Sequence, residues 1–162
     1  HFNIIPRIAM LSYSNFGSSD SPEARLVAEA TSLVKKKMPS LIVDGEMQAN
    51  VAFNKELLKE NYPFSELVDK DINTLIFPNL AAGNVAHNLL KELGGADAVG
   101  PILLGLKKPV HVLQLGSSVH SIINMALIAV VDAQSKDKNS STEEIVNQSP
   151  WWKRFKKVSK DM

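Results

Sequence analysis

The feature that most constrains the fold is the alternation of short apolar segments with longer segments of helical periodicity. Short apolar runs occupy residues 7–14, 41–45, 74–77, 100–106 and 110–113, and helical patterns occupy residues 21–38, 46–61, 80–93 and 119–134. The short runs lack a polar face, so we expect strands that are buried on both sides. The sequence therefore predicts an α/β fold, a three-layer αβα arrangement with a mainly parallel sheet.

Local signals set several boundaries of these elements. Ser21-Pro22-Glu23 is typical of a helix start, because proline is tolerated in the first turn and an acidic residue complements the helix dipole there. Asp44-Gly45 predicts a turn after the second strand, and Gly94-Gly95 predicts the end of the third helix. Within the helix predicted at residues 119–134, residues 122–131 are apolar nearly all round, which fits equally a core helix or a subunit interface.

Composition excludes several classes of protein. The chain has 162 residues, of which 44% are hydrophobic and 22% are charged, so it is expected to be globular. Its net charge of +1 gives no indication of nucleic acid or of an anionic membrane as partner. It has no cysteine, which excludes disulfides and cysteine-based metal sites within it, and no apolar stretch reaches the ~20 residues of a spanning helix. We expect a cytoplasmic protein.

The chain is expected to consist of one α/β domain, residues 7–134, followed by a polar linker and a basic, aromatic tail, residues 135–162. The tail holds both tryptophans among lysines, which suits a terminal helix that docks on the protein better than a membrane or nucleic-acid contact. The first residue is His1 rather than Met. We therefore expect the sequence to be part of a longer protein.

Ligands of parallel α/β sheets normally bind beyond the carboxyl ends of the strands. The loops expected there are residues 14–20, 44–46, 78–83 and 114–118, which predicts a single crevice with four polar loops. Residues 114–118 precede a helix and suit either an anion site or a serine cap, and the cap is the more common of the two. Residues 15–19 have the same ambiguity.

Other candidates for chemistry are weaker. Asp44-Gly45-Glu46 suits acid–base or metal chemistry, or, as we favour, a turn followed by a negative charge at a helix start. The histidines His87, His111 and His120 lack metal-ligand spacing. The three arginines, Arg7, Arg25 and Arg154, lie outside the four loops, although guanidinium groups are the usual clamps for phosphate.

Four ordered motifs carry a resemblance to the phosphate acetyltransferase family. They are Met10-Leu11-Ser12-Tyr13-Ser14-Asn15-Phe16-Gly17-Ser18, Val43-Asp44-Gly45-Glu46-Met47-Gln48-Ala49, residues 76–84 and residues 100–110. The resemblance implies two α/β domains with an active-site cleft between them, in which acetyl groups pass between coenzyme A and phosphate. This chain resembles the second of those domains together with its returning helix.

The chain departs from that family where charged groups are expected. The basic position of the first loop is Phe16, the Ser-Arg-Gly of the late loop reads Gln114-Leu115-Gly116, and the acid that follows it is Ser121. The glutamine expected in Gly-Pro-x-Leu-Gln-Gly is Leu104. Losing basic and acidic groups together removes the electrostatic reason to expect phosphoryl-linked catalysis.

The first and last loops are similar to those of the carboxy-terminal domain of bacterial NADP-dependent malic enzymes. The resemblance implies a non-catalytic regulatory and oligomer-forming domain that senses acetyl-CoA. Its partners would be further copies of the chain and a malic-enzyme region holding NADP and a divalent metal, and an active phosphate acetyltransferase is the alternative. The acetyl-CoA-binding residues carried over are Ser14, Asn15, Gly17, Ser18, Asn79, Asn84, Gln114, Gly116, Ser117 and Ser118. No cofactor, metal ligand or catalytic residue is expected in this domain.

Overall fold

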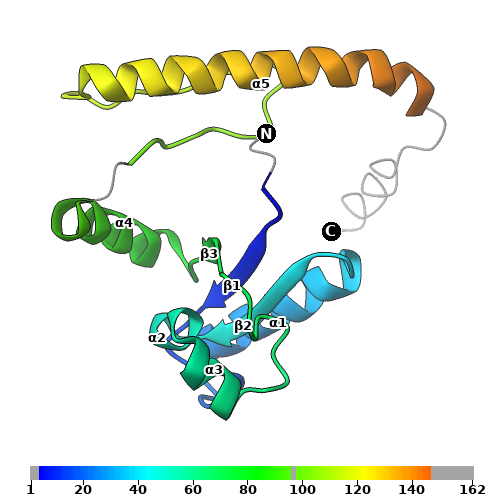
Figure 1. Ribbon diagram of the computed structural model, residues 1–162, viewed down its shortest axis with the longest axis vertical. Helices are drawn as coiled ribbons and strands as arrows, with labels where there is room; N and C mark the ends of the chain where they lie inside the picture. Colours follow the sequence, from blue (N-terminus) through cyan, green and yellow to red (C-terminus); the bar gives the residue numbers. More distant parts are fainter. Residues whose placement is uncertain (1–3, 96–97, 147–162) are drawn as a thin grey trace, which may run out of the picture. The chain divides into compact units, whose positions relative to one another are not determined.

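The computed structural model describes residues 4–95 and 98–146 (Figure 1). Contacts divide the chain into two compact units, with the boundary between residues 96 and 97. The first unit holds a parallel sheet and four helices, and the described part of the second holds one long helix. The boundaries expected from the sequence, 7–134 and 135–162, stay a prediction.

The sheet of the first unit has three parallel strands. They are β1 (Arg7–Leu11), β2 (Ile42–Met47) and β3 (Thr74–Ile76), in the order β2-β1-β3. Ile8 of the central strand lies opposite Val43 on one side and Thr74 on the other. The predicted parallel sheet is thus confirmed, and the carboxyl ends of its strands share one edge.

Helices cover both faces of this sheet, as the apolar strands require. Helix α1 (Pro22–Lys37) packs on one face, where Met10, Val27 and Val43 are buried together. The opposite face carries α2 (Ala49–Phe53) and α3 (Lys55–Asn61), and its core contains Ala9, Leu11, Met47, Val51, Ala52, Leu58 and Leu67 (Figure 1). Neighbouring residues of β1 point to opposite faces, so each strand contributes to both cores. The three-layer αβα arrangement is confirmed.

Helix α4 (Leu80–Gly94) follows β3 almost directly, as predicted. The side chain of Asn79 accepts a hydrogen bond from the amide of Ala82 at 2.9 Å and caps the helix. The helix ends at Gly95, whose φ of 60° lies in the left-handed region that favours glycine. The end predicted from Gly94-Gly95 is therefore confirmed.

The region from residue 42 to residue 61 differs from the prediction. No turn forms at Asp44-Gly45, and β2 continues to Met47, because Met47 is fully buried in the sheet core. The helix predicted at residues 46–61 is instead two short helices separated by Asn54. The backbone of Asn54 is extended and its side chain accepts from the amide of Leu57 at 2.9 Å, so this asparagine begins a new helix.

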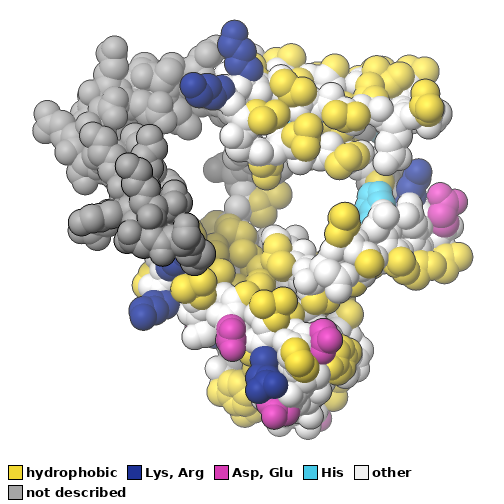
Figure 2. All heavy atoms as spheres, turned by 180° about the vertical axis from the view of Figure 1, so that it is seen from behind, with side chains coloured by type: hydrophobic (Ala, Val, Ile, Leu, Met, Phe, Trp, Pro, Cys, Tyr) yellow, Lys and Arg dark blue, Asp and Glu magenta, His cyan; other side chains and the backbone are white. Residues whose placement is uncertain are grey.

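The second unit also differs from the prediction. Residues 98–118 form neither of the two strands predicted there, because an apolar run forms a strand only where it meets a pairing partner, and none pairs with it within the described residues. Helix α5 (Val119–Val146) extends past the predicted end at Gln134, since residues 135–146 contain no glycine or proline. Hydrophobic side chains lie along the exposed surface of α5 (Figure 2). The tail at residues 147–162 lies outside the described residues.

Candidate functional site

The candidate site of the first unit lies at the carboxyl edge of the sheet. The loop that follows β1, Gln48 after β2 and Asn79 after β3 all leave the sheet at this edge. Residues 14–20 are therefore placed as predicted, whereas of the predicted loop 78–83 only residues 78 and 79 precede the helix and residues 80–83 form the first turn of α4. Residues 44–46 lie inside β2 rather than in a loop, and residues 114–118 belong to the second unit. The four-loop prediction is therefore wrong at residues 44–46, and the single crevice stays a prediction.

Glu46 organises the loop that follows β1. Its side chain is only 2% exposed, and its Oε1 accepts hydrogen bonds from the hydroxyl of Ser14 at 2.9 Å and the amide of Gly17 at 2.6 Å. Its backbone carbonyl accepts a third, from the amide of Phe16 at 2.8 Å. Three donors of the loop thus converge on one residue, and a buried carboxylate requires such donors.

The serine hydroxyls of this loop form a directional chain. The Ser14 hydroxyl donates its single proton to Oε1 of Glu46. Ser14 Oγ also accepts from the amide of Ser19 at 3.0 Å, and it lies 3.1 Å from Ser18 Oγ, which must therefore be the donor of that bond. Ser18 Oγ in turn accepts from the amide of Asn15 at 2.9 Å. Glu46 thereby sets the direction of the bond between the two hydroxyls.

The predicted binding residues of this loop have different exposures. Ser14 is fully buried, so its hydroxyl serves the loop itself, whereas Gly17 and Ser18 are exposed. Asn15 is half-buried, and its Oδ1 accepts from the amide of Gln48 at 2.7 Å, which joins the loop to the end of β2. The exposed surface of the loop is therefore formed by residues other than Ser14.

Phe16 turns toward the interior of its own unit. Its φ of 47° is positive, and its ring centroid lies 4.8 Å from that of Tyr62 and 5.0 Å from that of Phe64. The ring also packs against the core formed by β1, α2 and α3. The position that carries a basic residue in the resembled transferases is thus filled by an aromatic side chain used for packing.

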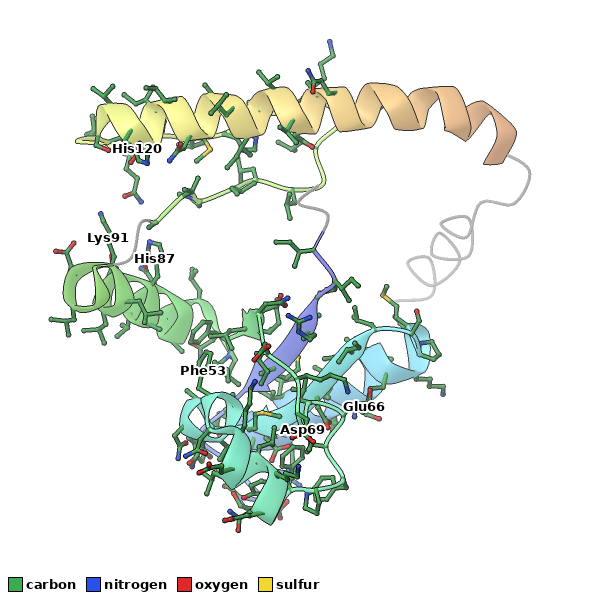
Figure 3. All side chains as sticks on the ribbon, viewed as in Figure 1. Phe53, Glu66, Asp69, His87, Lys91 and His120 are labelled. Carbon is green, nitrogen blue, oxygen red and sulfur yellow. The ribbon has the colours of Figure 1, made fainter. Side chains whose placement is uncertain are left out.

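Asp44 forms a second buried cluster, next to α1. The residue is 5% exposed; its Oδ1 accepts from Lys35 Nζ at 2.7 Å, and its Oδ2 accepts from Ser65 Oγ at 2.8 Å and from the amide of Glu66 at 2.9 Å. Lys35 Nζ also lies 3.1 Å from a carboxylate oxygen of Glu66, which comes from the segment between α3 and β3 (Figure 3). This cluster joins α1, β2 and that segment. Neither acidic residue of the 44–46 motif lies at a helix start, so our favoured interpretation of this motif was wrong.

The Asp44 cluster raises the pKa of Lys35. Burial lowers this pKa, but the hydrogen bonds to Asp44 and Glu66 and the attraction of both carboxylates outweigh burial and hold it above the ordinary value of 10.5. A pKa that is higher in the folded state stabilises the protein fully below the unfolded value and loses that contribution as pH rises through the folded value. The stabilisation should therefore disappear only in strongly alkaline solution.

We expect Lys35→Met to show this dependence. The wild-type protein should exceed the variant in free energy of unfolding by a constant amount up to about pH 10.5, and the difference should shrink above that pH as Lys35 loses its proton. Urea denaturation of both proteins at a series of pH values from neutral upward measures the difference. A difference that grows above that pH would contradict the assigned ion pair.

The remaining predicted residues of the first unit belong to α4. Asn79 is exposed, and its side-chain oxygen caps the helix. Asn84 is exposed one turn further on, where its backbone carbonyl accepts from the side chain of Asn88 at 3.0 Å. Both asparagines therefore lie near the start of α4, at the carboxyl edge of the sheet.

The predicted residues of the second unit form the start of α5. Ser118 Oγ accepts from the amide of Ser121 at 3.1 Å, the contact of a capping serine. The amide and hydroxyl of Ser117 both donate to the carbonyl of Gln114, at 3.1 and 2.7 Å. Gln114, Gly116 and Ser118 are exposed, and Gly116 has a φ of 85°. The serine-cap alternative is thus observed at this turn.

None of His87, His111 and His120 belongs to the hydrogen-bonded groups around Glu46 and Asp44. His87 projects from the same side of α4 as Lys91, one turn away, and His120 lies on α5 in the other unit (Figure 3). Within residues 4–95 and 98–146, no three His, Cys, Asp or Glu side chains are grouped so as to hold a metal ion. No helix in the described part of the chain is long and apolar enough to cross a membrane.

Sequence reasoning missed the role of Glu46. A signal was present, since Val43 and Met47 flank Asp44-Gly45-Glu46 with apolar residues that suit a continuing strand. The pair Asp44-Gly45 is typical of turns and led instead to the prediction of a turn at this position. Position 45 needs glycine for a different reason: its φ is 139°, and a Cβ atom there would lie 2.4 Å from the carbonyl oxygen of Met10.

Comparisons with known proteins agree with the fold and the motifs. The chain is 42% identical over 136 residues to an NADP-dependent malic enzyme of Escherichia coli, covering 83% of this chain and 18% of that protein. It is 42% identical over 132 residues to a phosphate acetyltransferase of Bacillus subtilis, covering 82% of this chain and 41% of that protein. The crystal structure of a phosphotransacetylase from Streptococcus pyogenes matches with a TM-score of 0.76 and 42% identity, over 83% of this chain and 40% of that one.

The chain thus spans less than half the length of these relatives and is homologous both to malic enzymes and to phosphate acetyltransferases. The family model described as phosphate acetyl/butaryl transferase matches residues 1–130. That match includes all three strands of the sheet and the beginning of α5. Together with the αβα sheet and its loops, it shows that this chain belongs to the phosphate acetyl/butaryl transferase family.

Proposed function

We propose that this chain is a non-catalytic regulatory and oligomer-forming module of a malic enzyme, and that it responds to acetyl-CoA. The parent protein would oxidise and decarboxylate malate to pyruvate with NADP and a divalent metal. The described residues offer no cluster that fits a metal ion. The proposal assigns the metal and NADP to a malic-enzyme region outside this chain.

The observation that carries the proposal is the position of Phe16. In a transferase that acts on acetyl phosphate, a cation in this loop would stabilise the charge of the phosphoryl group. Here the side chain packs against Tyr62 and Phe64. Position 16 therefore supplies no cation to stabilise that charge.

The loop at residues 114–118 supports the same conclusion. Leu115 stands where the resembled transferases carry arginine, and it is fully exposed. Of the two arginines within the described residues, Arg7 donates to the carbonyl of Asp71, and Arg25 of α1 pairs at 3.6 Å with Asp20, the last residue of the first loop. Neither is placed in the predicted loops to clamp phosphate.

The exposed polar groups support acetyl-CoA as the ligand. Gly17, Ser18, Asn79 and Asn84 present neutral groups at the carboxyl edge of the sheet. Gln114, Gly116 and Ser118 are exposed at the start of α5, next to the half-buried Ser117. Neutral hydrogen-bonding groups of this kind suit the amide and thioester parts of the ligand, and the start of a helix suits its phosphates.

Self-association is supported by the surface of the second unit. Val119, Leu127 and Val130 are exposed apolar residues on α5. Contiguous exposed apolar surface is typical of protein–protein interfaces. We expect light scattering of the full-length protein to show a dimer or a larger oligomer, and a monomer would contradict this part of the proposal.

The sensing function is tested with the full-length protein. We expect titration calorimetry to detect acetyl-CoA binding, and the rate of malate oxidation to change when acetyl-CoA is added. A regulator must bind one conformation more tightly than another, because equal affinity for both shifts nothing. Absence of both binding heat and a rate change would contradict acetyl-CoA sensing.

The alternative is an active phosphate acetyltransferase. The observation that favours it is the similarity to the phosphate acetyltransferase of Bacillus subtilis, which matches the malic enzyme of Escherichia coli in percentage identity. The alternative would require groups other than Phe16 and Leu115 to stabilise the phosphoryl charge. Formation of acetyl phosphate separates the two proposals.

A further inference from the structure

We propose that Glu46 is the positioning residue of the acetyl-CoA site, holding the loop at residues 14–18 in its binding conformation without touching the ligand. The inference rests on the proposed function, since it assigns a role within the same site. It follows from three observations: where Glu46 comes from, what it bonds, and which side of the loop is left exposed.

Glu46 joins two elements that are distant in the sequence. It belongs to β2, while the groups it bonds, Ser14 and Gly17, belong to the loop after β1. The two strands pair in parallel, and Met47, the next residue, lies opposite Leu11. The carboxylate is therefore fixed by the sheet, and the loop is fixed by the carboxylate.

The bonds of Glu46 determine the shape of the loop. Phe16 and Gly17 both have positive φ, 47° and 87°. Their consecutive amides donate to Glu46, one to its carbonyl and one to its side chain. The Phe16 amide meets a neutral carbonyl and the Gly17 amide meets the carboxylate, so two consecutive amides tie the turn of the loop to one residue of β2.

The ligand side of the loop is opposite to this anchor. Ser14 and Glu46 are buried, so neither can touch a ligand, while Gly17 and Ser18 are exposed. The position of Ser18 depends on Glu46 through Ser14 Oγ, which lies 3.1 Å from Ser18 Oγ. Removing the carboxylate of Glu46 should therefore displace the exposed side chain of Ser18, although Glu46 does not contact Ser18 directly.

The test compares four variants of the full-length protein by titration calorimetry with acetyl-CoA. Glu46→Leu removes the acceptor, and Ser14→Ala removes one of its donors. Both should raise the Kd at least about tenfold, as expected when a positioned group loses one good hydrogen bond. Glu46→Gln keeps an acceptor of the same shape and should stay within roughly threefold of the wild type, because the side-chain amide oxygen accepts the same bonds.

Asp44→Asn is the matched control. Asp44 is a buried carboxylate of the same strand that bonds Lys35, Ser65 and Glu66 instead of the loop. The variant should lower the melting temperature yet leave the Kd for acetyl-CoA unchanged at temperatures below both transitions. This comparison separates positioning from a general loss of stability.

The outcomes are distinct. A wild-type protein that gives no binding heat would overturn the proposed function on which the inference rests. Wild-type binding with an unchanged Kd in Glu46→Leu and Ser14→Ala would overturn the inference alone. A Kd raised equally in Asp44→Asn, or no rescue by Glu46→Gln, would overturn it as well. If Glu46→Leu does not fold, Ser14→Ala carries the same test.

Discussion

Replacing Gly45 by alanine should cost the protein roughly 3–5 kcal/mol of its free energy of unfolding, from a strained φ and from overpacking of the sheet. The added Cβ would lie 2.4 Å from the carbonyl oxygen of Met10 and 2.9 Å from its Cβ. Met10 belongs to the central strand, so the clash is with backbone that the sheet holds in place. Urea denaturation monitored by far-UV circular dichroism measures the loss.

Gly17→Ala is the matched control for that prediction. Gly17 also has a positive φ, 87°, but a Cβ atom there meets nothing within 4 Å. Only the backbone strain remains, about 1–2 kcal/mol. An equal loss of stability in the two variants would contradict the close approach of β1 to β2 at Gly45.

Replacing Asp44 by alanine should cost about 3 kcal/mol, because breaking a buried ion pair leaves its donors without an acceptor. Ser65 Oγ and the amide of Glu66 would lose Oδ2, and Lys35 would keep only Glu66. We place the value at the low end for such pairs, since the Lys35 side chain is 34% exposed. Thermal and urea unfolding of the variant measure the loss.

Asp20→Ala serves as the control for a surface pair. The side chains of Arg25 and Asp20 are 58% and 91% exposed and lie 3.6 Å apart. An exposed pair of this kind contributes less than about 1 kcal/mol. A loss of stability in Asp44→Ala no greater than in Asp20→Ala would contradict a structural role for the Asp44 cluster.

The sequence predicted the elements that its local pattern fully determines. The strands at β1 and β3 and the helices α1 and α4 follow from apolar runs and helical spacing, with Pro22, Asn79 and Gly95 at the ends. Hydrophobic burial on both faces then implies a parallel sheet with two helical layers. These conclusions need no knowledge of which strand pairs with which.

The errors arose where tertiary contacts outweigh local preference. Asp44-Gly45 is typical of a turn, but burial of Met47 and the close approach of Met10 extend the strand through it. The apolar residues 100–106 and 110–113 have the pattern of strands, yet strand formation requires a partner that the pattern does not supply. Asn54 divides a predicted helix because its side chain begins a new one.

The candidate site was predictable only in outline. Its position at the carboxyl edge follows from the fold class, so the loop at residues 14–18 was identified correctly as a loop of that edge. Which residues of this loop are buried anchors and which are exposed was not predictable. The burial of Ser14 and its bond to Glu46 depend on contacts between residues far apart in the sequence.

The most direct test of the central claim is an assay for acetyl phosphate formation from acetyl-CoA and inorganic phosphate, with the purified full-length protein. We expect no formation of acetyl phosphate above the uncatalysed rate, because Phe16 and Leu115 replace the groups that would stabilise the phosphoryl charge. Turnover that is abolished by substitution of Gln114 or Ser117 would contradict the account and establish an active transferase.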